Sequence, residues 1–208
     1  MFSSFYAQAL FLFTLSFILA GLEVEAEGKY GWASKMPTWY RTSGIAGKLY
    51  GMIMGGKPLT GYHSFMFVLP LAIFHAGFFM GAPWSLAAET LAFAKYFATA
   101  VLWDFLWFVI NPAYGMSNFT KESVWWHAKS YWVFGLFPAD YAVGWAISLG
   151  CAFAASKLGG PSVLEHAFMM CGLLVCTIIT IALSPLYHAW YKNMRKTDDR
   201  DTVEGLRS

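Results

Sequence analysis

The sequence predicts an all-α integral membrane protein, a bundle of about five transmembrane helices with an interfacial segment between helices 1 and 2. Two observations support this prediction. Hydrophobic residues make up 58% of the chain and charged residues only 12%, whereas soluble domains carry about 25% charged residues. The apolar residues also form runs of about 20, which is the length that an α-helix needs to cross the hydrocarbon layer of a membrane.

Five runs of this kind follow one another along the chain. They cover approximately residues 5–22, 62–80, 85–110, 139–158 and 163–187. Together they predict one transmembrane domain over residues 1–190, followed by a polar cytoplasmic tail at 191–208. We interpret the first run as a retained helix, because residues 1–22 contain no Lys or Arg and a signal peptide begins with a basic region.

The segment between the first two helices differs from the runs that flank it. Its glycines at positions 47, 51 and 55 have a spacing that lets helices approach closely. Its aromatic residues are of the types that gather at a membrane–water interface, namely Trp32, Trp39, Tyr40 and Tyr50. We therefore expect an interfacial segment with one short amphipathic helix. The second and third helices, by contrast, are joined by the tight stretch MGAPWS and must lie antiparallel.

Basic residues are divided unevenly between the two ends of the predicted helices. The richer end carries Lys29, Lys35, Arg41, Lys48, Lys57, Lys121, Lys129, Lys192, Arg195, Lys196, Arg200 and Arg207. The opposite end carries Lys157. Because cytoplasmic loops are enriched in Lys and Arg, we predict an inner or plasma membrane protein with its N-terminus outside and its C-terminus in the cytoplasm. The charge pattern thus indicates orientation, and no basic stripe suits a nucleic acid.

Polar residues of the second and third helices fall at two matching depths. At 1.5 Å per residue, His75 and Glu89 both lie about 10 Å from the connecting turn. His63 and Asp104 both lie about 30 Å from it, near the predicted cytoplasmic boundary. The hairpin therefore offers two level His–carboxylate pairs. Helical phase does not decide whether either pair meets.

The inner level gathers the most ionisable groups. Glu23, Glu25 and Glu27 leave the first helix at this end, and His127 lies in the loop after the third helix. Carboxylates and imidazoles are the ligands that suit zinc, iron or manganese, and helix bundles build metal sites from inward-facing side chains of these types. The sequence therefore predicts a transition-metal site, for iron, zinc, copper or manganese, formed by residues that share no short motif.

Asp104 is the residue for which a function is most strongly indicated. It lies inside a membrane helix between aromatic residues, and an ionisable residue in such a place implies a functional role with a partner. We name His63 as its first partner. A structural role for Asp104, as a hydrogen-bonded helix residue, is the alternative reading.

Two further histidines suit a different cofactor. His75 and His166 lie in apolar helices where a haem or chlorophyll-type macrocycle could pack and be ligated without a covalent link. The chain has no CxxCH motif for covalent haem attachment. The alternative for both histidines is a hydrogen-bonded place in the protein core.

These residues support three hypotheses about function. In the first, a polar, metal-binding site opens to the cytoplasm and acts on a lipid or other apolar molecule, with Asp104, His63 and His127 as ligands or general acid and base. In the second, the chain is a non-catalytic subunit that joins other subunits in a respiratory or photosynthetic membrane complex. In the third, it is a small transporter or ion pathway that uses Lys95, Glu89 and Asp104.

Overall fold

The computed structural model describes residues 4–197. This part of the chain contains six α-helices, two short 3-10 helices and two two-stranded antiparallel ladders, in which β1 pairs with β2 and β3 with β4. In chain order the elements are α1 (Ser4–Glu27), β1 (Tyr40–Arg41), α2 (Gly44–Ile53), β2 (Leu59–Thr60), α3 (Gly61–Phe79), α4 (Leu86–Ile110), η1 (Met116–Asn118), η2 (Trp125–His127), β3 (Trp132–Val133), β4 (Phe137–Pro138), α5 (Ala139–Lys157) and α6 (Val163–Lys196). The short helix α2 lies where the sequence predicts one in the interfacial segment.

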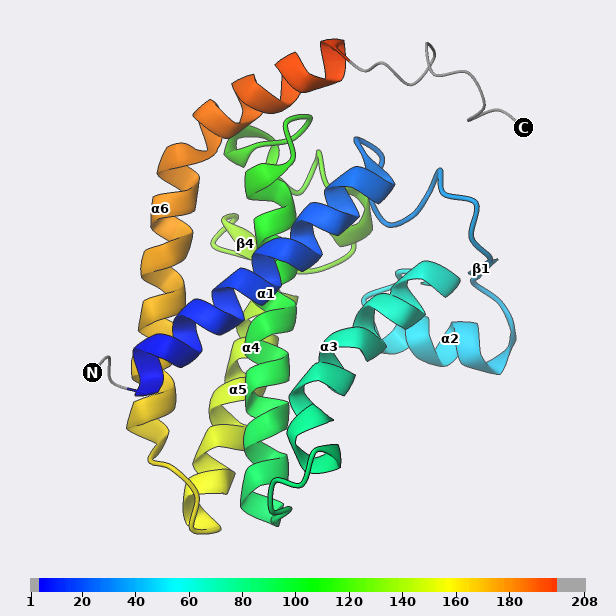
Figure 1. The fold of residues 1–208 in the computed structure, drawn as a ribbon. Coiled ribbons are helices and arrows are strands. Elements are labelled where there is room, and N and C mark those ends of the chain that lie inside the picture. The colour runs from blue at the N-terminus through cyan, green and yellow to red at the C-terminus, as the bar shows by residue number, and fades with distance from the viewer. Residues whose placement is uncertain (1–3, 198–208) are drawn as a thin grey trace, which may run out of the picture.

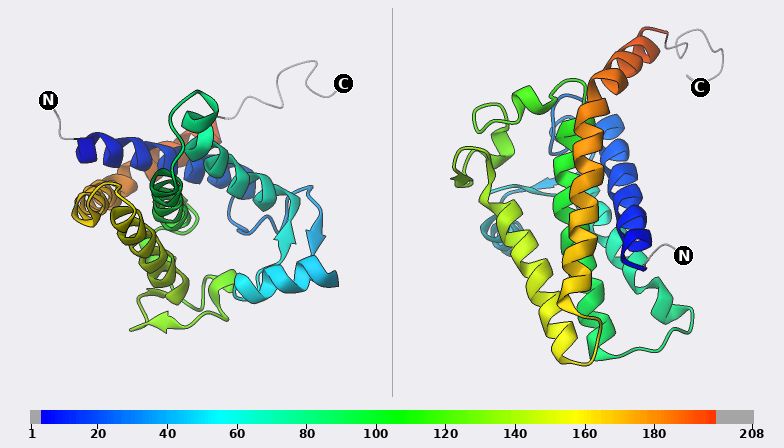
Figure 2. Two further views of the ribbon diagram at one scale, coloured as in Figure 1. Left: turned by 90° about the horizontal axis from the view of Figure 1, so that it is seen from below. Right: turned by 90° about the vertical axis from the view of Figure 1, so that its left-hand side faces the viewer.

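Helix α4 is the centre of the bundle (Figure 1). Figure 2 shows α1, α3, α5 and α6 arranged around it. Leu106, Phe108 and Val109 of α4 have no exposed surface. Its second half is the most buried part of the bundle, while Leu86 and Phe93 near its start are exposed. The buried half is apolar around most of its circumference, which is the pattern of a buried helix.

Four helices in residues 4–197 are long and apolar enough to cross a membrane, namely α1, α3, α4 and α6. They correspond to four of the five predicted transmembrane helices. The remaining prediction, residues 139–158, corresponds to α5, which forms a helix of 19 residues but does not belong to the four. Polar and small residues such as Asp140 and Gly144 lower the mean hydropathy of this segment.

Helix α1 continues well past the end of its apolar run near Leu22. The residues that follow are Glu, Val and Ala, and most of them favour a helix although they are not all apolar. Gly28 then ends the helix with a φ of +58°, a conformation that glycine adopts without a steric penalty. The extension brings Glu23 and Glu27 into regular helix, one turn apart on the same face.

Helix α6 also outlasts its prediction. It ends at Lys196 rather than near Tyr187, so the first residues of the predicted tail are helical; residues 198–208 of that tail lie outside the described part of the chain. Pro185 lies inside α6, and Figure 1 shows the helix bending in its orange final part. A proline removes a backbone hydrogen bond and commonly kinks a helix in this way.

The packing of α1 against α6 depends on one glycine, which gives a first testable prediction. A Cβ added at Gly172 would lie 2.7 Å from the Cβ of Ala9, and neither atom can move without its backbone. Gly172→Ala should therefore separate the two helices and cost about 1–3 kcal/mol, which corresponds to a fall of at least about 2 °C in Tm. Thermal unfolding in detergent micelles, followed by circular dichroism, measures this change.

Gly150→Ala on α5 is the matched control. A Cβ at Gly150 meets no atom within 4 Å, and alanine favours a helix over glycine by about 1 kcal/mol. The control should leave Tm unchanged or raise it. Equal shifts for the two variants would contradict the close packing of α1 against α6.

Candidate metal centre

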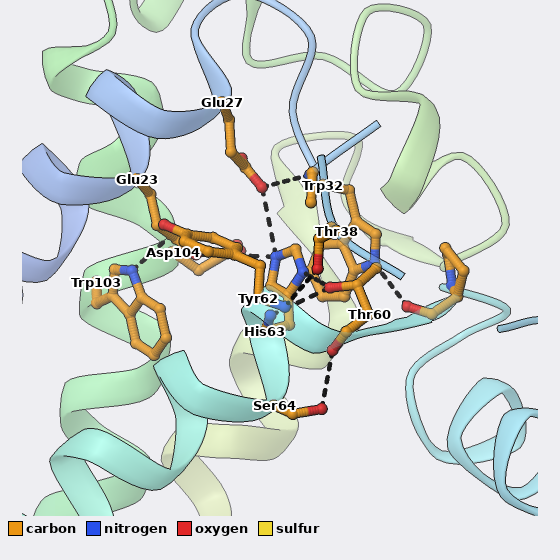
Figure 3. A network of polar contacts seen from close by, with 12 residues as sticks. Glu23, Glu27, Trp32, Thr38, Thr60, Tyr62, His63, Ser64, Trp103 and Asp104 are labelled. Atoms are coloured by element: carbon orange, nitrogen blue, oxygen red, sulfur yellow. Dashed lines mark hydrogen bonds and ion pairs between the residues drawn. The ribbon is translucent and has the colours of Figure 1, made fainter. Parts of the chain in front are cut away.

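Three ionisable side chains converge where the end of α1 meets the start of α3. Glu23 and Glu27 project from α1, and His63 is the third residue of α3 (Figure 3). The ligand atoms of the three side chains lie within 4.8 Å of one another, and all three residues are buried. His63 Nε2 is 3.8 Å from Glu23 Oε1 and 3.5 Å from Glu27 Oε1. We call Glu23, Glu27 and His63 the carboxylate–histidine triad.

The orientation of the His63 ring is fixed by the residue that caps α3. Thr60 is the N-cap of this helix, and its hydroxyl oxygen accepts a hydrogen bond from the His63 backbone N–H. The same hydroxyl is 2.8 Å from His63 Nδ1. A hydrogen bond to one ring nitrogen directs the other nitrogen toward a metal, as in metalloproteins generally. Nε2 is thereby left facing the two glutamates.

Trp32 holds the His63 ring from the side. The two rings are stacked, with centroids 4.0 Å apart and an angle of 15° between their planes. The Trp32 indole N–H donates to the Pro58 carbonyl oxygen at 2.9 Å, and Lys57 Nζ lies 5.0 Å from the centroid of the same indole ring. His63 is therefore restrained by contacts in addition to its helix.

Each glutamate also has a donor of its own. Trp103 of α4 donates its indole N–H to Glu23 Oε2 at 2.6 Å, and the Ala33 backbone N–H donates to Glu27 Oε1 at 2.5 Å. The second contact requires an unusual loop, in which Trp32 and Ala33 have φ values of 44° and 51°. Non-glycine residues in this region are strained, and such strain is concentrated at functional sites.

Asp104 belongs to a second group of polar residues beside the triad. Its Oδ2 accepts a hydrogen bond from the Tyr141 hydroxyl and lies 3.3 Å from His127 Nε2. His127 Nδ1 lies 3.4 Å from Asp140 Oδ2, and Asp140 also contacts Lys57 at 3.5 Å. We call these five residues the Asp104 network. The prediction that His63 is the first partner of Asp104 is wrong, because the loop residue His127 occupies that place.

A cavity of about 30 Å³ lies between the two groups. Glu23, Glu27, His63 and Asp104 line its polar side, and the rest of the lining is largely aromatic: Trp32, Phe67, Trp103, Trp107, Phe108 and Trp126. Such a volume accommodates about two water molecules or an ion with one small ligand.

Carboxylates outnumber cations in this region. Glu23, Glu27, Asp104 and Asp140 face Lys57 and two histidines in the described part of the chain. The phenol of Tyr50 adds no negative charge, since burial raises its pKa, as do the charges of Tyr96 and Glu23. Glu23 and Glu27 are the buried members of this group, and buried carboxylates without compensating charge are costly, so the pair is suited to holding a cation.

The structure separates the other predicted site residues from the triad. Glu25 is exposed and pairs with Arg195 at 3.2 Å. His75 and Glu89, which the sequence places at one level without deciding whether they meet, do meet, with His75 Nε2 3.0 Å from Glu89 Oε1. His75 Nδ1 is 2.7 Å from the Leu71 carbonyl oxygen. Since both ring nitrogens are engaged, ligation of a macrocycle metal by His75 would require one of these contacts to break.

His166 is likewise placed in the core of the bundle. Its Nε2 lies 2.8 Å from the Ser148 hydroxyl, which donates to the Ala94 carbonyl oxygen at 2.7 Å. The contact joins α6 to α5 and α4 beside Phe5 and Gln8 at the start of α1, whereas the triad lies at the end of α1. Macrocycle binding at either histidine therefore stays a prediction that none of these contacts supports.

Sequence reasoning missed the residues that orient the triad and the network. Thr60, Trp103, Lys57 and Tyr141 carry no local signal of a site, because they reach it only through the folding of loops and helices onto one another. Glu23 and Glu27 did carry a signal, the spacing of four within a segment of good helix formers.

Comparison with protein families, with curated protein sequences and with solved structures finds no match to this chain.

Proposed function

We propose that this chain is an integral membrane enzyme that binds one divalent transition metal ion at Glu23, Glu27 and His63. The observation that carries the proposal is the convergence of their three ligand atoms within 4.8 Å in a buried pocket, each side chain held by a separate hydrogen bond. Two carboxylates and one imidazole suit iron, zinc or manganese. The hydrogen bonds from Thr60, Trp103 and Ala33 are the kind that orient metal ligands.

The membrane location is supported by the outer surface of the helices. Large apolar side chains point away from the bundle on α1, α3 and α6, among them Phe11, Phe65 and Ile178, each more than half exposed. Exposed apolar surface of this extent indicates contact with an apolar environment. These surfaces would face the lipid.

We further propose that α5 makes a fifth crossing. In Figure 1, α4 ends and α6 begins at opposite ends of the bundle, and α5 returns the chain from one to the other. If α4 and α6 cross the membrane, α5 must cross it as well. Five crossings agree with an external N-terminus and a cytoplasmic C-terminus, and they put the triad near the cytoplasmic surface.

A catalytic role is supported by the number of ligands. Metal sites that catalyse reactions commonly use three protein ligands and leave a position for water or substrate. Asp104 lines the same cavity, and its Oδ1 makes no hydrogen bond within residues 4–197. Asp104 is thus suited to accept a proton in the cavity as a general base, while Tyr141 and His127 fix its carboxylate through Oδ2.

The lining of the cavity bears on the substrate. A cavity of about 30 Å³ admits only the reacting group of a substrate, and aromatic side chains form most of its wall. A site near the end of membrane helices is accessible to molecules dissolved in the bilayer. We therefore propose a lipid or other apolar molecule as the substrate, with its reacting group at the triad and the remainder in the membrane.

Elemental analysis of the purified protein, together with an absorption spectrum, tests the proposal. We expect close to one iron, zinc, copper or manganese ion per chain, which a chelator removes. Absence of any transition metal, both as purified and after reconstitution, would refute the metal centre. A haem or pigment absorption band would support instead the hypothesis of a membrane-complex subunit.

A further inference from the structure

A second cavity lies at the other end of α1 from the triad. It has a volume of about 40 Å³ and is formed where the starts of α1 and α6 meet α4 and α5. Its wall combines apolar side chains with polar ones, among them Phe5, Leu91, Ala152, Gln8, Ser162 and His166. No residue of the triad or of the Asp104 network lines this cavity, so the proposed metal centre does not account for its polar groups.

His166 presents a lone pair at this place. Its Nε2 lies 2.8 Å from the Ser148 hydroxyl, and that hydroxyl donates its single hydrogen to the Ala94 carbonyl oxygen at 2.7 Å. Nε2 must therefore carry the ring N–H and donate it to Ser148 Oγ. No residue of the described chain forms an ion pair with the ring that would favour a charged form. Because a neutral imidazole has only one N–H, Nδ1 of His166 is a hydrogen-bond acceptor.

This acceptor has no partner, yet it is not enclosed. His166 is 5% exposed, and its Nδ1 makes no hydrogen bond within residues 4–197. It is not among the enclosed, unpaired side-chain atoms of this part of the chain, which belong to Tyr50, Tyr62, Thr99, Trp107 and His127. Since nearly all of His166 is covered and the residue lines the cavity, the remaining surface of Nδ1 is reached through the cavity.

The cavity also offers donors beside this acceptor. Ser162 is the N-cap of α6, and its hydroxyl oxygen accepts a hydrogen bond from the Leu164 backbone N–H at 3.2 Å. The hydrogen of that hydroxyl has no acceptor within residues 4–197, and the Gln8 amide makes no hydrogen bond there. A group that donates to Nδ1 and accepts from Ser162 or Gln8 therefore matches the cavity. A hydroxyl group has both capacities.

The place of the cavity bears on the molecule that carries the hydroxyl. His166 is the fourth residue of α6, so it lies about 5 Å along the axis from the start of that helix. This level is close to the polar boundary of the proposed membrane span. An amphiphilic alcohol in a bilayer places its hydroxyl at the same boundary and its chain in the hydrocarbon, and the apolar part of the cavity wall suits the carbon atoms next to the hydroxyl.

We propose that this cavity binds the hydroxyl group of an apolar alcohol or phenol dissolved in the membrane, and that the hydroxyl donates to His166 Nδ1. The proposal depends on the membrane location but not on the metal centre. A volume of about 40 Å³ admits the hydroxyl and little more, so the rest of the molecule lies outside the cavity. Water is the competing occupant, because it also donates and accepts and is small enough to enter.

A pair of photoreactive probes distinguishes an apolar alcohol from water. Both probes have the same long alkyl chain with a diazirine near one end; that end carries a hydroxyl in one probe and a fluorine, of similar size but unable to donate, in the other. Mass spectrometry of the wild type in lipid nanodiscs measures labelling of residues 5–8 and 161–166, which border the cavity. We expect the alcohol to label them about two- to tenfold more than the fluoride, the effect of one hydrogen bond.

Two variants locate the acceptor. His166→Phe keeps an aromatic ring but has no lone pair, so the two probes should label it equally. Glu165→Ala is the matched control, because Glu165 is exposed, lines the same cavity and carries the other acceptor of α6 that could receive the hydroxyl hydrogen. This control should keep the wild-type preference for the alcohol.

Each outcome decides the proposal without reference to metal content. Equal labelling of the wild type by the two probes, or labelling by neither, overturns the proposal and leaves the cavity to water. A preference that is lost in Glu165→Ala and kept in His166→Phe overturns the role of His166. If His166→Phe does not fold, ¹⁵N-histidine spectra of the wild type replace it: 1-decanol should shift one Nδ1 resonance and 1-fluorodecane should not, and identical spectra refute the contact.

Discussion

Replacing either Glu23 or Glu27 by glutamine is expected to lower the affinity of the chain for a divalent transition metal ion by at least about a hundredfold. Residues that merely orient metal ligands contribute about 10- to 100-fold to affinity, and a direct carboxylate ligand should contribute no less. Glutamine keeps the size of the side chain but removes its charge. Competition of the purified variants with a chromogenic chelator measures the change.

Glu25→Gln is the control that the chain itself provides. Glu25 lies on the same helix between the two proposed ligands, but its side chain is exposed and pairs with Arg195. Its variant should bind metal as the wild type does. A loss of affinity as large in Glu25→Gln as in the other two would show that general negative charge, and not the triad, attracts the ion.

Although Glu23→Gln should weaken metal binding, it should make the metal-free protein more stable to heat. In the metal-free protein, Glu23 and Glu27 are two carboxylates buried side by side, and removing one of them relieves the cost of desolvating and crowding like charges. We expect Glu23→Gln to raise the Tm of the metal-free protein and to abolish most of the additional stabilisation by metal. A Tm lowered by the substitution in the absence of metal would mean that Glu23 is mainly a structural hydrogen-bond acceptor for Trp103.

Gly31→Ala is expected to be the most destabilising small substitution near the site, with a loss of at least about 3 kcal/mol. Gly31 has a φ of +67°, and an added Cβ would overlap the six-membered ring of Trp126. The left-handed conformation alone costs about 1–2 kcal/mol for alanine, and displacing a packed indole adds to this. At about 2–4 °C per kcal/mol for a chain of this length, Tm should fall by about 6 °C or more.

Gly28→Ala isolates the contribution of the overlap. Gly28 has a φ of +58°, yet a Cβ there meets no atom within 4 Å. It should show only the conformational cost. Metal affinity should fall in Gly31→Ala and hold in Gly28→Ala, because displacing Gly31 also displaces Trp32 and Ala33, which contact His63 and Glu27. Similar Tm shifts in both variants would contradict the packing of Trp126 on this loop.

The sequence predicted the helices well because their signal is local. The long apolar runs predicted helices, and the structure has helices over most of the predicted ranges. The short stretch MGAPWS predicted that the two helices it connects, α3 and α4, lie antiparallel. The predicted end of the first helix was wrong, because the segment after Leu22 is no longer apolar but still favours a helix. The apolar run ends near Leu22, yet the helix continues to Glu27, because Glu and Ala sustain a helix in polar surroundings.

The candidate site could be predicted only as a set of residues near one end of the bundle. Depth along the helices grouped Glu23, Glu25, Glu27 and His63 at one level, since the rise per residue is fixed, and the structure brings all of them together except Glu25. Depth also placed Asp104 at this level. The pairing of Asp104 could not be read in the same way, because His127 arrives on a loop whose path depends on tertiary contacts. Trp126 packs against Trp107 and Phe108 of α4, and Trp132 donates its indole N–H to the His127 carbonyl oxygen.

By itself, therefore, the sequence determined the predominantly helical class, the hairpin of α3 and α4, and the level at which the ionisable residues gather, because each follows from composition and helical geometry. The tertiary structure alone decided which of those residues face one another. Packing left Glu25 exposed while Glu23 and Glu27 became buried. It brought His63 into contact with these two glutamates and Asp104 into contact with His127. It also placed Thr60, Trp103 and Trp107 at the site. The physical reason is that a helix fixes depth along its axis, whereas rotation about that axis and the course of loops are set by packing between segments distant in the chain.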